Sequence, residues 1–131
     1  MTSRGDPRSR TADRPGTSAG ALHASVATDG PTTVIRLGGS LRSATAPTLR
    51  EAVDAALDGR PVTVVLDLAG LRADDELGLW VLPAMAGDAA RRGIDLVIAA
   101  PDRALRVRLR RLGGHHLNIA ETVPVARGFS R

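Results

Sequence analysis

The chain has 131 residues, a length that fits a single domain with one hydrophobic core. Apolar residues make up 43% of it, but one Trp, one Phe and no Tyr leave almost no aromatic platform for stacking nucleobases or sugars. The absence of Cys excludes disulfides and thiolate metal sites, and we find neither a secretion signal nor a membrane-spanning apolar stretch, so we expect a cytoplasmic protein.

Charge is distributed unevenly along the chain, although the formal net charge is only +4. Residues 21–90 carry five Arg against nine acids, whereas residues 91–131 carry nine Arg against three acids. Every basic residue is Arg, which together with much Ala, Gly and Leu is more typical of GC-rich coding than of selection for phosphate binding. The basic and acidic halves therefore matter more than the total charge.

The ends of the chain differ in composition from its middle. Residues 1–20 are rich in Ser, Thr, Gly, Pro, Arg and Asp, with too few apolar side chains to offset the entropy lost on ordering. We predict a disordered tail over residues 1–20, one domain over residues 21–127 and a C-terminal tail over residues 128–131.

The domain opens with a predicted antiparallel hairpin. Apolar residues alternate over residues 22–26, turn residues follow at 28–31, and a second strand runs over residues 33–37. The pair Gly38-Gly39 is expected to end that strand. Ser43 or Thr45 then caps a helix that ends near Gly59, tolerates Pro47 in its first turn and buries Leu49, Val53 and Ala56.

A continuous β-branched and apolar run over residues 62–66 predicts a central strand that ends at Asp67. Three consecutive acids, Asp74, Asp75 and Glu76, precede a segment of helical composition over residues 77–92 that Gly93 closes. Pro83 lies too deep in this segment for an N-terminal proline. We therefore expect either a kink at Pro83 or a helix that begins later than the acids suggest.

The last predicted elements are a strand over residues 94–100, a helix that starts at Pro101-Asp102, and a short strand over residues 116–120. The helix carries a leucine stripe at i, i+4 and i+7 and ends at Gly113-Gly114. Its stripe consists of Leu105, Leu109 and Leu112. The order of elements predicts an α/β fold with a mixed four- to five-stranded sheet and helices packed on it.

The three acids have a catalytic and a structural interpretation. A general acid/base pair needs two carboxyl groups in different environments, whereas consecutive side chains at a loop-to-helix junction diverge into solvent. A calcium loop needs oxygen ligands at alternating positions over about twelve residues, which the cluster lacks. Capping and the helix dipole explain acids at a helix start without any chemistry, so we predict a non-enzymatic protein.

No cofactor or metal site is predicted. The adjacent His115 and His116 follow a Gly pair and diverge, with no further ligand at usable spacing. A glycine-rich phosphate loop with its Lys and a nucleophile elbow around a Ser are both absent. The predicted helix after Pro101 carries five Arg, which suits nucleic acid, an acidic protein surface or plain solvation. We expect solvation and no nucleic-acid binding.

One local pattern, together with the element order, resembles the STAS domain of bacterial anti-sigma factor antagonists. In that family a strand ending in D-L-x-G precedes D-S-[ST]-G-L, whose Ser is phosphorylated by the partner. Here residues 64–70, Val-Val-Leu-Asp-Leu-Ala-Gly, match the strand, and Asp75, Gly78 and Leu79 match the D-x-x-G-L frame. The resemblance therefore puts Glu76 in the place of the phosphoacceptor Ser.

The resemblance extends over residues 22–125. Residues 39–42, Gly-Ser-Leu-Arg, stand where the family commonly has G-E-L-D, and residues 45–47, Thr-Ala-Pro, match the helix opening. Residues 93–101 match the later strand, and residues 112–114, Leu-Gly-Gly, resemble the family's L-x-G close. It implies a STAS fold.

Two departures from the family pattern limit what the resemblance implies. Glu76 has no hydroxyl, and Leu77 replaces the second hydroxyl, so phosphorylation at this motif is excluded. Arg42 replaces an acid near the partner surface. The fixed charge of Glu76 has two opposite interpretations: it mimics the phosphorylated state and weakens partner binding, or it is tolerated or paired with an Arg, which gives constitutive binding.

The resemblance implies a regulatory protein-binding module that acts in transcription through an anti-sigma factor of the serine-kinase type. Its predicted partner-binding residues are Arg42, Asp75, Glu76, Leu77 and Gly78. No membrane partner is expected, and the oligomeric state, monomer or homodimer, is left open. The alternatives are a STAS subunit of a lipid-transport or stress-signalling complex, a nucleic-acid binder using the Arg-rich helix, and a small enzyme using the acids.

Overall fold

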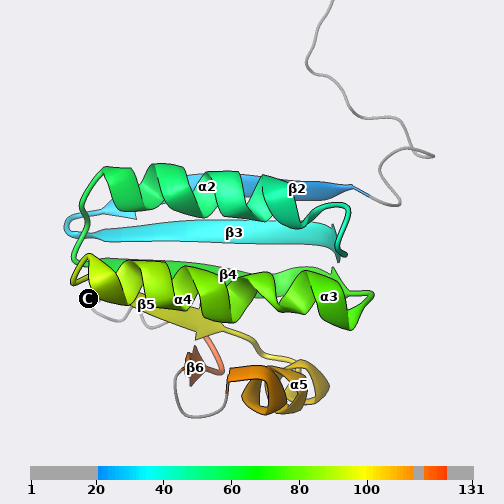
Figure 1. Cartoon of the computed structure of the whole chain (residues 1–131). Coiled ribbons are helices and arrows are strands. Elements are labelled where there is room, and N and C mark those ends of the chain that lie inside the picture. The colour runs from blue at the N-terminus through cyan, green and yellow to red at the C-terminus, as the bar shows by residue number, and fades with distance from the viewer. Residues whose placement is uncertain (1–20, 114–116, 124–131) are drawn as a thin grey trace, which may run out of the picture.

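A computed structural model describes residues 21–113 and 117–123, and this part of the chain forms one five-stranded sheet with helices packed against it (Figure 1). The sheet order is β2-β3-β4-β5-β6; β2 and β3 are antiparallel and the other neighbours are parallel. The predicted α/β fold with a mixed sheet is confirmed. The strands are β2 (Leu22–Asp29), β3 (Thr32–Leu41), β4 (Thr63–Ala73), β5 (Asp95–Ala99) and β6 (Asn118–Ala120).

Figure 1 shows α3 and α4 end to end in one row, with α2 alongside this row on the same face of the sheet and α5 next to β6. Residues buried on the inner faces of α2 and α4 pack against the apolar side chains of β3 and β4 in a single core cluster. The helices are α2 (Ala46–Asp58), α3 (Glu76–Leu79), α4 (Val81–Arg91) and α5 (Arg103–Gly113).

The predicted tails fall on residues that the structure does not describe, namely 1–20 and 124–131, so their boundaries stay predictions. His115 and His116 also lie outside the described residues. Within the described part, no helix is both long and apolar enough to cross a membrane.

The N-terminal hairpin is confirmed, but its second strand is longer than expected. β3 continues through Gly38 and Gly39 to Leu41, with a register shift against β4 between Arg36 and Gly38. A Cβ at Gly39, which has φ +101°, would lie 2.1 Å from the carbonyl oxygen of Ala21. Gly39 therefore serves the close approach of two backbones and does not end the strand.

The prediction that the central strand ends at Asp67 is also wrong, because β4 continues to Ala73. Its added half pairs with the added half of β3, from Gly38 opposite Gly70 to Leu41 opposite Ala73. Each extension supplies backbone partners for the other, a long-range effect that the local sequence does not reveal. The two extended strands end side by side, which brings the three acids next to the loop after β3.

The segment after the acids is divided into two helical pieces. α3 ends at Leu79, Trp80 separates it from α4, and Pro83 is the third residue of α4. In a first turn the backbone N–H has no intrahelical acceptor, so a proline is tolerated there. The expected later start therefore holds only for α4, which begins at Val81, because helical structure already begins at Glu76 in α3. The close at Gly93, where φ is +72°, is confirmed.

The remaining helix predictions are largely confirmed. α2 ends at Asp58 with Gly59 as its C-cap, and its inner face buries Leu49, Val53 and Leu57, whereas Ala56 is only partly buried. α5 buries Leu105 and Leu109, and Asp102 accepts a hydrogen bond from the backbone N–H of Ala104 at its start. The hydroxyl of Thr45, however, makes no capping bond to α2; its role in the preceding loop is described below.

Candidate functional site

The candidate site lies where the parallel strands β3 and β4 end. Leu41 and Ala73 are register partners, so the loops that follow them start at the same edge of the sheet. The backbone N–H of Asp74 donates to the carbonyl oxygen of Leu41 at 3.0 Å and joins the two loops. Three of the predicted site segments, the loop at Arg42, the acids and α3, are therefore adjacent.

Asp75 is the N-cap of α3 and also connects the two loops. One carboxylate oxygen, Oδ1, accepts from the backbone N–H of Gly78 at 2.6 Å. The other oxygen, Oδ2, accepts from the backbone N–H of Ser43 at 3.3 Å. Asp75 has extended backbone dihedrals, φ −144° and ψ 160°, as a capping residue requires. Both oxygens are thus engaged in structural hydrogen bonds.

Gly78 is buried because α3 lies directly on the backbone of the loop at Arg42. A Cβ at position 78 would lie 2.7 Å from both Cα and the carbonyl carbon of Arg42. No side chain fits in that space, since ordinary carbon contacts lie at 3.4 Å or more. Gly78 therefore sets how closely α3 approaches the loop.

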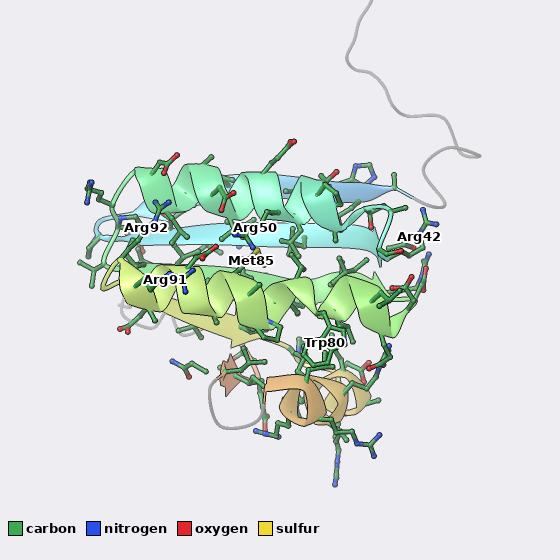
Figure 2. The ribbon with its side chains drawn as sticks, viewed as in Figure 1. Arg42, Arg50, Trp80, Met85, Arg91 and Arg92 are labelled. Carbon is green, nitrogen blue, oxygen red and sulfur yellow. The ribbon has the colours of Figure 1, made fainter. Side chains whose placement is uncertain are left out.

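Thr45 fixes the loop that carries Arg42. Its Oγ1 accepts from the backbone N–H of Arg42 at 2.9 Å and donates to the carbonyl oxygen of Ser40 at 2.7 Å. The hydroxyl thus stabilises the loop before α2, a role that explains why it does not cap the helix. Arg42 is partly buried, and Figure 2 shows it at the end of the sheet.

Glu76 forms an ion pair with Arg108 of α5. Its Oε1 accepts from Arg108 Nε at 2.9 Å and lies 2.8 Å from Arg108 Nη2. Arg108 Nη1 also donates to the carbonyl oxygen of Ala73, at 2.9 Å. The side chains of Glu76 and Arg108 are 58% and 31% exposed, respectively. The carboxylate is therefore held beside a cation of the same chain while remaining at the surface.

Arg108 is a residue that the sequence analysis did not single out. The composition of the helix predicts five solvated Arg, although Arg108 lies three residues after Leu105 and four before Leu112. That spacing places it at the border of the buried stripe of α5, which is the signal that separates it from the outward-facing Arg.

Two apolar side chains project to solvent around α3. Leu77 is 70% exposed and Trp80 is 52% exposed. Figure 2 shows Trp80 on the side of the α3–α4 junction that faces α5. The sequence analysis named Leu77 and missed Trp80, which follows it at the i+3 spacing of one helix face. Exposed Leu and Trp so close together are typical of a protein-contact surface.

The arrangement of the acids gives no support to catalysis. Asp75 is committed to capping, Glu76 is paired with Arg108, and Asp74 is exposed. Among the described residues, no group of three or more His, Cys, Asp or Glu side chains is placed to hold a metal ion. Asp75 and Glu76 are thus both engaged in contacts within the chain.

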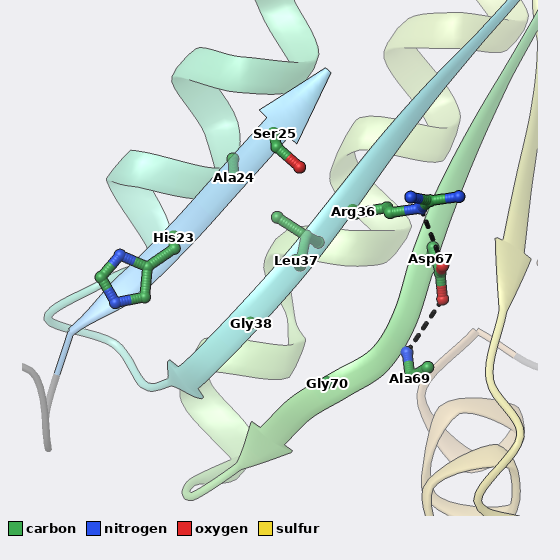
Figure 3. Close-up of a pocket in the computed structure, with 9 residues that line it drawn as sticks. All are labelled: His23, Ala24, Ser25, Arg36, Leu37, Gly38, Asp67, Ala69 and Gly70. Atoms are coloured by element: carbon green, nitrogen blue, oxygen red, sulfur yellow. Dashed lines mark hydrogen bonds and ion pairs between the residues drawn. The ribbon is translucent and has the colours of Figure 1, made fainter. Parts of the chain in front are cut away.

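A shallow depression of about 400 Å³ lies elsewhere, on β2, β3 and β4 (Figure 3). Asp67 in its wall accepts from the backbone N–H of Ala69 and lies 3.7 Å from Arg36 Nε. The depression includes none of the three acids, and its lining is His23, Ala24, Ser25, Arg36, Leu37, Gly38, Asp67, Ala69 and Gly70.

Comparisons with known proteins agree with this geometry. A family model described as "Mlab, STAS domain" matches residues 24–120. Among curated proteins, no sequence matches the chain significantly. The crystal structure of an anti-sigma factor antagonist from Mycobacterium paratuberculosis is similar at a TM-score of 0.64 and 21% identity, over 80% of this chain and 90% of that one.

A second similar structure is that of the anti-sigma factor antagonist SpoIIAA in its unphosphorylated form. Its TM-score is 0.55 at 16% identity, and the match covers 79% of this chain and 93% of that one. At 21% and 16% identity, these similarities show that the fold is shared.

Proposed function

The chain belongs to the STAS domain family, and from this premise we propose that it is a non-enzymatic regulatory module that binds a protein partner through the α3 junction. The observation that carries the proposal is the exposure of Leu77, at 70%, on the short helix α3, whose residues on either side of Leu77 are held in place by contacts within the chain. Asp75 caps this turn and Gly78 seats it on the loop at Arg42. A rigid turn that presents an apolar side chain suits recognition, because little entropy is lost on binding.

The proposed partner is an anti-sigma factor of the serine-kinase type. The two similar structures described above are both of anti-sigma factor antagonists, which supports a partner of this class. The proposed contact residues are those expected from the sequence, Arg42, Asp75, Glu76, Leu77 and Gly78. In this set Leu77 makes the apolar contact, whereas Asp75 and Gly78 hold it in place.

Control by phosphorylation is absent from the proposed mechanism, because neither Glu76 nor Leu77 has a hydroxyl. Of the two interpretations of the fixed charge, the contact with Arg108 supports constitutive binding. A phosphoserine carries a charge of about −1.5 to −2, whereas the single charge of the Glu76 carboxylate has a cation at 2.8 Å. The module is proposed to remain in its binding state.

The test is a binding measurement with the purified serine-kinase-type anti-sigma factors encoded in the same genome. Leu77→Asp places a charge in the proposed apolar contact and should weaken binding at least about tenfold. Val62→Asp is the matched control, since Val62 is 61% exposed and lies before β4, at the opposite end of the sheet. Equal binding by the two variants would remove α3 from the interface.

A second candidate function is a STAS subunit of another complex, in lipid transport or stress signalling. It is favoured by the description of the matching family model, "Mlab, STAS domain". Affinity purification of the full chain separates the two candidates, because recovery of transporter subunits in place of an anti-sigma factor would select the second.

A further inference from the structure

The Arg residues of α5 divide into an inward-facing and an outward-facing set. Arg106 Nη1 donates to the carbonyl oxygens of Ala100 and Pro101, both at 2.8 Å, and Arg108 contacts Ala73 and Glu76. The other three Arg of the helix are exposed, and no ion pair or hydrogen bond of their side chains is found within the described residues. These three are Arg103, Arg110 and Arg111.

The outward-facing set surrounds an exposed apolar side chain. Arg103, Val107 and Arg110 follow each other at i, i+4 and i+7, which places them on one helix face. Val107 is 39% exposed although it is apolar. At 3.6 residues per turn, Val107 and Arg111 project at angles around the helix axis that lie between those of Arg103 and Arg108. The outward face is therefore continuous with Arg108, whose side chain contacts Glu76 of α3.

The ion pair between Glu76 and Arg108 joins this face to the proposed binding turn. Leu77 follows Glu76 directly, and Trp80 lies one turn later on the same side of α3 as Glu76. The described part of the chain has five exposed large apolar side chains, and three of them lie near this pair: Leu77 on α3, Trp80 directly after α3 and Val107 on α5.

We propose that the partner-binding surface extends from Leu77 across Trp80 onto α5, and that it accepts a protein segment with an apolar centre and an acidic rim. The proposal rests on the proposed function and adds the chemistry of the partner. We call Leu77, Trp80, Val107, Arg103, Arg110 and Arg111 the α3–α5 surface.

Charge complementarity decides the nature of the partner. Arg108 compensates Glu76, so the charges of the α3–α5 surface that lack a partner are all positive. Positive charges at the rim of an apolar patch attract acidic side chains and accelerate association. A nucleic acid is a poorer occupant, because Leu77 and Val107 contribute nothing to binding a phosphate backbone and Trp80 alone is no stacking platform for bases. The carboxylate of Asp74, which is exposed next to α3, would also repel phosphate groups.

The test compares two triple substitutions of equal charge change, using a serine-kinase-type anti-sigma factor from the same genome as the probe. The first variant carries Arg103→Gln, Arg110→Gln and Arg111→Gln. The control carries Arg60→Gln, Arg91→Gln and Arg92→Gln; Figure 2 shows Arg91 and Arg92 at the far end of α4 from Trp80. Gln and Arg have similar helix propensities, so α5 should stay folded, which circular dichroism checks.

The α5 triple variant should bind about tenfold more weakly than the wild type at low salt. This difference in affinity should shrink as salt is added, because screening weakens the Arg contacts that only the wild type makes. The control should stay within about twofold of the wild type. Trp80→Ala should also cost about tenfold, with little dependence on salt, since its contribution is apolar.

Three other results would each overturn the proposal in a distinguishable way. If the α5 triple variant and Trp80→Ala both bind like the control while Leu77→Asp does not bind, the partner surface ends at α3 and the proposed function stands. If Leu77→Asp also binds normally, or the wild type does not bind, the proposed function itself fails. If a short duplex DNA binds to the wild type and not to the α5 triple variant, while anti-sigma factor binding is unchanged, the outward face of α5 serves nucleic acid.

Discussion

Replacing Gly78 with Ala adds one methyl group at the point where α3 rests on the loop after β3. The new Cβ would lie 2.7 Å from two backbone carbons and 2.9 Å from the backbone nitrogen of Arg42. These distances are about 0.7 Å shorter than ordinary carbon contacts, and the opposing atoms are backbone that no side-chain rotation can move away. The turn must therefore shift outward as a unit.

An outward shift also weakens the capping bond, because the backbone N–H that Asp75 accepts belongs to Gly78. Overpacking typically costs 1–3 kcal/mol and a lost cap about 1 kcal/mol, so we expect the free energy of unfolding to fall by about 2–4 kcal/mol. For a domain of this size the melting temperature should drop by roughly 8–15 °C. Partner binding should fall as well, since Leu77 moves with the turn.

Gly87 provides a control of the opposite sign. It lies inside α4, and a Cβ there would be 3.6 Å from the end of the flexible Arg91 side chain. Gly87→Ala should therefore stabilise the protein by up to about 1 kcal/mol through helix propensity. Urea unfolding of both variants measures the two changes. An unchanged or increased free energy of unfolding for Gly78→Ala would show that α3 does not rest on the loop as described.

Three further predictions concern the same region. Asp75→Ala should lower the free energy of unfolding by about 1–2 kcal/mol, because two backbone N–H groups lose their acceptor; urea unfolding with Asp74→Ala as the control checks this, and equal effects would contradict the capping role. A double-mutant cycle of Glu76→Gln and Arg108→Gln should give a coupling of only about 0.2–1 kcal/mol that decreases in 1 M salt, since both side chains are partly exposed; no coupling at low salt would disprove the pair. Leu109→Ala should destabilise the protein by about 2–5 kcal/mol in thermal or urea unfolding, because Leu109 is fully buried on the inner face of α5, and a loss below about 1 kcal/mol would mean that α5 is poorly packed.

The three acids that stand together in the sequence have separate roles in the structure. Asp75 is held by two backbone N–H groups, Glu76 is held by Arg108, and Asp74 remains exposed while its backbone bonds to Leu41. Adjacent residues in an extended chain point in different directions, so neighbours in sequence seldom share a partner. The cluster is therefore a junction that positions Leu77.

The fold could be predicted from the sequence to the extent that its signals are local. The alternation at the start of the domain, the β-branched run before Asp67 and the leucine stripe of α5 depend only on neighbouring residues. The close at Gly93 likewise follows from the backbone preference of a single residue, because its φ of +72° favours glycine. The D-x-x-G-L frame identified the family, and the position of Asp75 before a helix indicated its capping role.

The tertiary structure alone decided how far β3 and β4 extend and what surrounds Glu76. The ends of these strands stabilise each other through pairs such as Leu41 with Ala73, which lie 32 positions apart in the sequence. The same separation divides Glu76 from Arg108, and the contact exists only because α5 packs beside the end of the sheet. Such contacts depend on register and packing across the whole domain, so a single sequence shows which residue carries the fixed charge but not which cation compensates it.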